Sequence, residues 1–96
     1  MTTADEIFSA INEVQDPETG VGLVDMGLIY KAELLDNCIH VVMTLTTPTC
    51  PLAGAIQEGV ERRLLRIAKQ VNVELTYDPP WSTDKVSEAG RQQLGL

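Results

Sequence analysis

Apolar residues recur along this chain with two spacings, and these spacings predict its secondary structure. From Ile7 to Val14 they follow helical spacing, whereas from Val71 to Tyr77 they alternate with polar residues, as in a strand. Read over the whole chain, the pattern predicts a helix, a β-hairpin, a second helix, a third strand and a short C-terminal helix capped by Ser82. The expected ranges are 4–15, 28–35, 38–46, 51–70, 71–77 and 82–89.

The hairpin is the most strongly determined of these elements. Asp36-Asn37 has the composition of a two-residue turn, because both residue types tolerate positive φ. This turn sets the register of the two strands, since each residue before it faces a residue after it. The predicted pairs are Leu35 with Cys38, Leu34 with Ile39, Glu33 with His40, Ala32 with Val41, Lys31 with Val42, Tyr30 with Met43, Ile29 with Thr44 and Leu28 with Leu45.

This register makes one face of the hairpin almost wholly apolar and the other mixed, which is typical of a sheet covered on one side. His40 falls on the mixed face opposite Glu33, so we interpret it as a cross-strand partner rather than a metal ligand. A β-helix-β crossover makes the third strand parallel to the second. We therefore predict a single two-layer α+β domain over residues 1–96, with a three-stranded mixed sheet and helices on one face; the position of the third strand stays open.

The composition of the chain argues against several classes of function. Fourteen acidic and seven basic side chains give a net charge of −7, which opposes binding to nucleic acid, because that affinity rests on neutralising phosphates. The chain shows neither a targeting segment at its N-terminus nor an apolar run of membrane-spanning length, so we expect a soluble cytoplasmic protein with no membrane partner. Signatures for nucleotide hydrolysis, dinucleotide redox chemistry, structural zinc and serine hydrolysis are all missing from the sequence.

Cys50 is the residue best suited to a chemical role. It lies between Pro48 and Pro51, where the second strand runs into the second helix, and is the expected N-cap of that helix. The unpaired amides and the dipole of a helix N-terminus favour a thiolate. The hydroxyls of the threonines around it, Thr44, Thr46, Thr47 and Thr49, are available to hydrogen-bond that thiolate or a metal bound to it.

A plainer interpretation is that Cys50 only caps a helix and that the nearby threonines are ordinary strand residues. One cysteine cannot hold a zinc ion or a cluster without further ligands. Cys38 is no candidate, because it belongs to the other end of the same strand, about 25 Å away at the usual rise per residue. We therefore expect neither an intrachain disulfide nor a metal shared by the two cysteines.

The loop from Asp16 to Gly27 carries three acids, Asp16, Glu18 and Asp25. The residues favour structural roles: Asp16 caps a turn ahead of Pro17, and Asp25 accepts backbone N–H bonds within the loop.

Together these segments resemble a known family. Asp16-Pro17-Glu18, the run from Val24 to Tyr30, the run from Thr44 to Leu52, Asp78-Pro-Pro-Trp81 and Leu94-Gly95 are similar, in order and spacing, to the PaaD-like and SufT-like iron-sulfur cluster assembly domains. The chain lacks the cysteine-rich C-terminal segment of the PaaD type, which favours a general SufT-like role over a dedicated one in an oxygenase pathway.

The resemblance implies an accessory or targeting factor in iron-sulfur cluster assembly or transfer, with Cys50 as its key residue and Asp16, Glu18, Thr46 and Thr47 gathered around it. No tightly bound cofactor is expected; Cys50 holds a transient iron-sulfur cluster only if a partner or a second chain of a homodimer supplies another thiolate. The implied partners are the assembly machinery and client apoproteins. The resemblance implies no catalytic turnover, but a thiol-based redox enzyme or sensor with a nucleophilic Cys50, or a plain interaction adaptor with a structural cysteine, stays open.

Overall fold

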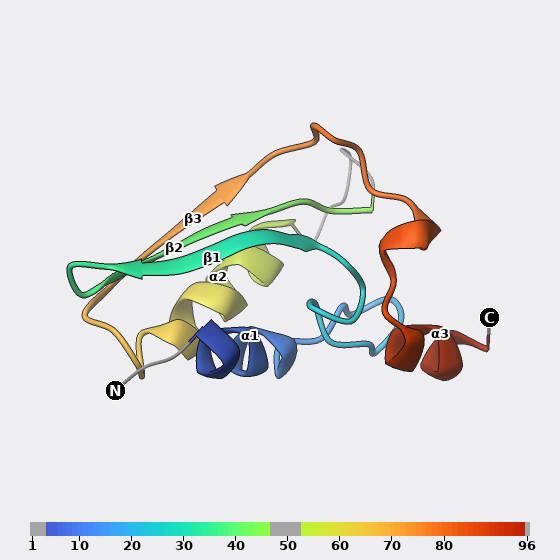
Figure 1. Ribbon diagram of the computed structural model, residues 1–96, viewed down its shortest axis with the longest axis horizontal. Coiled ribbons are helices and arrows are strands. Elements are labelled where there is room, and N and C mark those ends of the chain that lie inside the picture. The colour runs from blue at the N-terminus through green and yellow to red at the C-terminus, as the bar shows by residue number, and fades with distance from the viewer. Residues whose placement is uncertain (1–3, 47–52, 96) are drawn as a thin grey trace.

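The computed structural model describes residues 4–46 and 53–95. The elements, in chain order, are α1 (Ala4–Asn12), β1 (Ile29–Leu35), β2 (Cys38–Met43), α2 (Ala53–Leu64), β3 (Gln70–Leu75), the 3-10 turn η1 (Thr83–Lys85) and α3 (Glu88–Leu94). Helices α1 and α2 lie together on one side of the sheet, and α3 lies beyond the end of the strands (Figure 1). This is the predicted two-layer α+β arrangement and the predicted order of elements.

The sheet has the order β1-β2-β3, so the position of the third strand, which the sequence left open, is beside β2. β1 is antiparallel to β2, whereas β3 is parallel to it, as the crossover rule required. Asp36 and Asn37 have φ values of 50° and 68°, which are the left-handed conformations that a tight hairpin turn needs. The turn chemistry therefore predicted the hairpin correctly.

The predicted register is correct from Leu35 back to Lys31 and wrong beyond it. A β-bulge between Ile29 and Lys31 pairs Ile29 with Met43 instead of Thr44. The bulge turns Ile29 toward the core, and Tyr30 does not pair with Met43 as predicted. The Tyr30 hydroxyl instead donates to the Pro79 carbonyl at 2.6 Å.

The core lies between the inner face of the sheet and the two helices. Alternate β2 residues point into it, which is why Ile39, Val41 and Met43 are buried while their strand neighbours are half-buried. The helices contribute their periodic apolar residues to the same layer. Among the described residues, the largest fully buried apolar side chains are Ile7, Ile11, Val21, Leu23, Leu28, Ile39, Val41, Met43, Val60 and Leu64.

The first helix ends earlier than predicted, at Asn12 rather than Gln15. The next two residues continue with tighter backbone bonds, Glu13 N–H to Ala10 and Val14 N–H to Ile11. At this end of the helix, the Asn12 side chain donates to the Asp25 carboxylate and accepts the Asp25 backbone N–H.

The C-terminal helix was predicted in the wrong place. Ser82 precedes only the short η1 turn, without a side-chain cap, and the helix begins after Ser87, whose hydroxyl accepts the Gly90 N–H at 3.0 Å. Gly90 does not end the helix; a Cβ there would lie 2.8 Å from the Asp25 carbonyl oxygen, so the glycine permits close packing. Gly95, with φ of 76°, is the residue that closes α3.

Candidate functional site

Three segments that the sequence singled out meet where β1 begins and β2 ends; we call this region the motif end of the sheet, comprising residues 24–30, 44–46 and 78–81. The Thr44 N–H donates to the Leu28 carbonyl at 2.8 Å. The Trp81 indole N–H donates to the Met26 carbonyl at 2.6 Å, and its ring packs against the core. Trp81 is therefore the packing residue that a lone tryptophan usually is, and its hydrogen bond joins the C-terminal segment to the loop.

Asp16 organises a turn within the loop, as predicted. Its side chain is almost fully buried, and Oδ1 accepts the Glu18 N–H at 3.1 Å, while Oδ2 accepts the Thr19 hydroxyl at 3.3 Å. Its backbone carbonyl also accepts the Gly20 N–H. All these partners lie within four residues of Asp16, so the turn is built locally, and the Glu18 side chain is left exposed.

Asp25 has a different role from the one predicted. Its carboxylate accepts two side-chain donors, the Asn12 amide at 3.0 Å and the Ser87 hydroxyl at 2.8 Å, instead of backbone N–H groups. The Asp25 backbone N–H donates to Asn12, and its carbonyl accepts the Ser87 N–H. Asp25 therefore joins the end of α1 to the start of α3 across the loop.

Sequence reasoning missed Asn12 and Ser87 as partners of this acid. The Ser87-Glu88 pair is a helix-start signal that was available, since serine is a favoured N-cap and glutamate is favoured in the first turn. No local pattern singles out Asn12.

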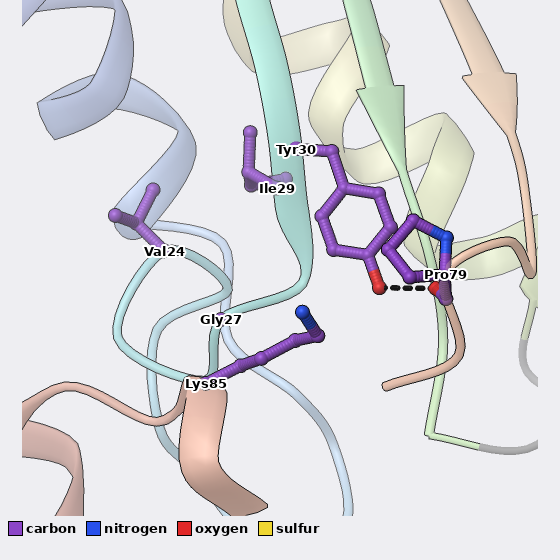
Figure 2. Close-up of a pocket in the computed structure, with 6 residues that line it drawn as sticks. All are labelled: Val24, Gly27, Ile29, Tyr30, Pro79 and Lys85. Carbon is purple, nitrogen blue, oxygen red and sulfur yellow. Dashed lines mark hydrogen bonds between the residues drawn. The ribbon is translucent and has the colours of Figure 1, made fainter. Parts of the chain in front are cut away.

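A shallow pocket of about 590 Å³ opens at the motif end. Figure 2 shows the side chains that line it, with the Tyr30 ring beside Pro79 and the Lys85 side chain reaching across the opening. The Lys85 ammonium lies 5.3 Å from the centre of the Tyr30 ring, within range of a cation–π contact. The lining residues are Val24, Gly27, Ile29, Tyr30, Pro79 and Lys85.

Gly27 lets the loop approach η1 closely enough to form this pocket. Its φ is 75°, and a Cβ at this position would overlap the carbonyl of Lys85. Only glycine satisfies both conditions without displacing the backbone. The walls of the pocket are mainly apolar, and Lys85 is the charged residue among them.

The predicted site residues are only partly described by the structure. Cys50 and Thr47 lie outside the described residues, so the predicted N-cap and thiolate at Cys50 stay predictions. Thr46 is half-buried, and no hydrogen bond joins it to Asp16 or Glu18 within residues 4–46 and 53–95. The gathering of the four residues around Cys50 therefore stays a prediction as well.

His40 pairs with Glu33, as the register predicted, and Cys38 is a half-buried free thiol beside the hairpin turn. Among the described residues, no group of three or more histidine, cysteine or acidic side chains is arranged to hold a metal ion. No helix within residues 4–46 and 53–95 has the length and hydropathy needed to cross a membrane.

The fold and the motif end define a small α+β domain in which residues 24–30, 44–46 and 78–81 are joined across one end of a three-stranded sheet. The chain belongs to the iron-sulfur cluster assembly protein family, whose sequence model matches residues 4–75. The family resemblance drawn from the motifs is thereby confirmed, and it assigns the chain to iron-sulfur protein maturation.

Individual relatives agree with this assignment. The chain is 37% identical over 95 residues to an Fe-S protein maturation auxiliary factor of Bacillus subtilis, covering 96% of this chain and 93% of the relative. It is also 37% identical over 99 residues to an Fe-S protein maturation auxiliary factor of Porphyromonas gingivalis, covering 100% of this chain and 94% of the relative. A crystal structure of a domain of unknown function from Bacillus anthracis matches with a TM-score of 0.90 at 30% identity, covering 96% of this chain and 91% of that one.

Proposed function

We propose that this protein is an auxiliary factor in iron-sulfur protein maturation that acts through Cys50 and through protein contacts, not by catalytic turnover. The observation that carries this proposal is the family match over residues 4–75 together with two full-length relatives that are named as maturation auxiliary factors. The fold supports it, because the described motif segments are held together by hydrogen bonds and are not scattered over the surface.

Cys50 is the residue that we propose contacts the cargo, an iron-sulfur cluster in transit. Thiolates are the usual ligands of such clusters, and the position of Cys50 ahead of a helix favours the thiolate form. Among the described residues, no group of three or more histidine, cysteine or acidic side chains is placed to hold a metal. We propose that the remaining ligands come from the partner that delivers or accepts the cluster.

The pocket at the motif end is the surface that we propose for those contacts. It combines apolar walls with one ammonium group, in a protein whose net charge is −7. A pocket of this kind suits an apolar side chain with an acidic group beside it, because Lys85 attracts the charge and the apolar walls bury the rest. The client or assembly protein would supply both.

The direct test is co-purification from cells, comparing the Cys50→Ala variant with the unaltered protein. Cys38→Ala is the matched control, since Cys38 lies at the hairpin turn and lines no part of the pocket. We expect Cys50→Ala to lose iron-sulfur assembly or client proteins that Cys38→Ala retains. Equal sets of bound proteins in all three samples would contradict a role for Cys50 in these contacts.

Anaerobic cluster reconstitution followed by visible absorption tests the cargo separately. We expect a signal that depends on Cys50 and on an added client protein but is indifferent to Cys38. If no cluster signal forms and the co-purifying proteins are nevertheless lost with Cys50→Ala, the protein is an adaptor that does not hold the cluster itself.

A further inference from the structure

The outer edge of β3 carries a row of backbone groups for which the described part of the chain offers no partner strand. β3 pairs with β2 alone in this sheet. On the β2 side, the Gln70 N–H donates to the carbonyl of Asn37, just before β2, at 3.3 Å, and the Thr76 N–H donates to the carbonyl of Met43 at 2.9 Å. In a parallel pair, alternate residues direct both their N–H and C=O to the same neighbour. Val71, Val73 and Leu75 therefore direct their N–H and C=O groups outward, to the free edge.

This edge lacks several of the features that usually protect a strand from pairing, although it carries one charged residue, Glu74. The opposite edge, on β1, has a β-bulge and a lysine at the bulge, and both discourage the approach of another strand. β3 has the sequence Gln-Val-Asn-Val-Glu-Leu, with no proline, no lysine and a regular register over all six residues. Its three inward-facing side chains are only half-buried, so apolar surface beside the edge is left uncovered.

We propose that this edge binds the same edge of a second copy of the chain, antiparallel, with the two-fold axis at Val73. In this register Val73 faces Val73 of the second copy, and Val71 faces its Leu75. Each pair exchanges two hydrogen bonds, so all six outward N–H groups of the two copies find acceptors. The result is a continuous six-stranded sheet in which the half-buried apolar side chains of the two copies meet on the same face.

The charges along β3 agree with this register. Asn72 faces Glu74 of the second copy, and Gln70 faces its Thr76, so no like charges are opposed. In an alternative register, the two-fold axis lies at Asn72. Leu75 then has no partner within β3 of the second copy, and fewer than six hydrogen bonds form between the two strands. Self-complementarity favours a second copy over an unrelated extended peptide.

The proposed dimer has a consequence for the motif end. Because the strands pair antiparallel, the C-terminal ends of the two copies of β2 point to opposite ends of the six-stranded sheet. With Met43 beside Leu75 in each copy, the two Met43 residues are separated by roughly 20 Å at usual strand spacings. The two motif ends therefore act separately, and this dimer leaves the external cluster ligands to another protein. The proposed dimer does not depend on the proposed function, so each can be contradicted without the other.

Sedimentation over micromolar to millimolar protein concentrations tests the dimer, which should be weak because its interface is small. Asn72→Lys places a lysine opposite Glu74 twice in the dimer and should lower the dissociation constant of the dimer about five-fold. Asn72→Glu should raise this constant about five-fold. Gln70→Lys is the matched control, because Thr76 faces that position and is uncharged. Asn72 and Gln70 are both exposed in the single chain, so these variants should fold.

Hydrogen exchange locates the contact. The amides of Val71, Val73 and Leu75 should become more protected as concentration rises, while those of Asn72 and Glu74, already bonded to β2, should not change. A chain that stays monomeric over the whole range would overturn the proposal. The proposal would also be overturned if Gln70→Lys strengthened the dimer and Asn72→Lys weakened it, because the shifted register predicts that pattern.

Discussion

Asp16 and Asp25 lie in the same loop but hold the protein together in different ways. Asp16 is the more buried of the two, yet every partner of its carboxylate lies within three residues. Asp25 is half-buried, and its carboxylate joins Asn12 to Ser87. Ser87 lies 62 residues after Asp25 in the chain. Burial alone therefore does not rank these acids, because the one with distant partners holds elements together while the other shapes a turn.

The largest expected effect comes from Asp25→Ala. This change removes an acceptor and leaves the Asn12 amide and the Ser87 hydroxyl without their partner, so we expect about 3 kcal/mol of lost stability. Urea denaturation measures it, with Asp84→Ala, at an exposed acid of η1, as the control. A loss no greater than that of Asp84→Ala would show that Asp25 does not join these elements.

Ser87→Ala breaks the same connection from its other side. The hydroxyl donates to Asp25 and accepts from Gly90 as the N-cap of α3, so its removal should cost about 2 kcal/mol. The double variant with Asp25→Ala should be less destabilised than the two single losses added together, because both remove the same hydrogen bond. Simple additivity would argue against a shared connection.

Asp16→Ala should have a smaller effect of about 1 kcal/mol, because the turn it stabilises keeps its backbone bonds from Thr19 and Gly20. Asp16→Asn, which retains an acceptor for the Glu18 N–H, should recover part of that loss. Equal destabilisation by Asp16→Ala and Asp25→Ala in the same denaturation series would remove the distinction between local and distant partners.

The smallest effect concerns a third kind of contact, the exposed ion pair between Glu13 and Arg63 at 2.8 Å. A hydrogen bond from Arg63, with its charge and that of Arg66, lowers the pKa of Glu13 below its ordinary value. A lowered folded-state pKa contributes stability above the unfolded-state pKa, and this contribution is lost as pH falls through the folded-state value. The small stability difference between the unaltered protein and Glu13→Gln should therefore disappear in acid, and chemical denaturation at several pH values would detect a persistent difference.

The sequence predicted those features whose physical cause is short in range. Helical and strand periods located the main elements, and two residues with positive φ set the hairpin register as far as Lys31. The helix N-terminus and its flanking prolines selected Cys50, whereas its proposed neighbours came from the family resemblance. These signals need only adjacent residues, so they can be read without a structure.

The tertiary structure alone decided the features that depend on distant partners. The bulge that pairs Ile29 with Met43 leaves the alternation of residue types unchanged, so no periodic pattern revealed it. The C-terminal helix begins at Ser87 and packs Gly90 against the Asp25 carbonyl, a contact that local propensity cannot encode. Periodicity and turn chemistry are local, whereas the connection between Asp25, Asn12 and Ser87 exists only once the chain has folded.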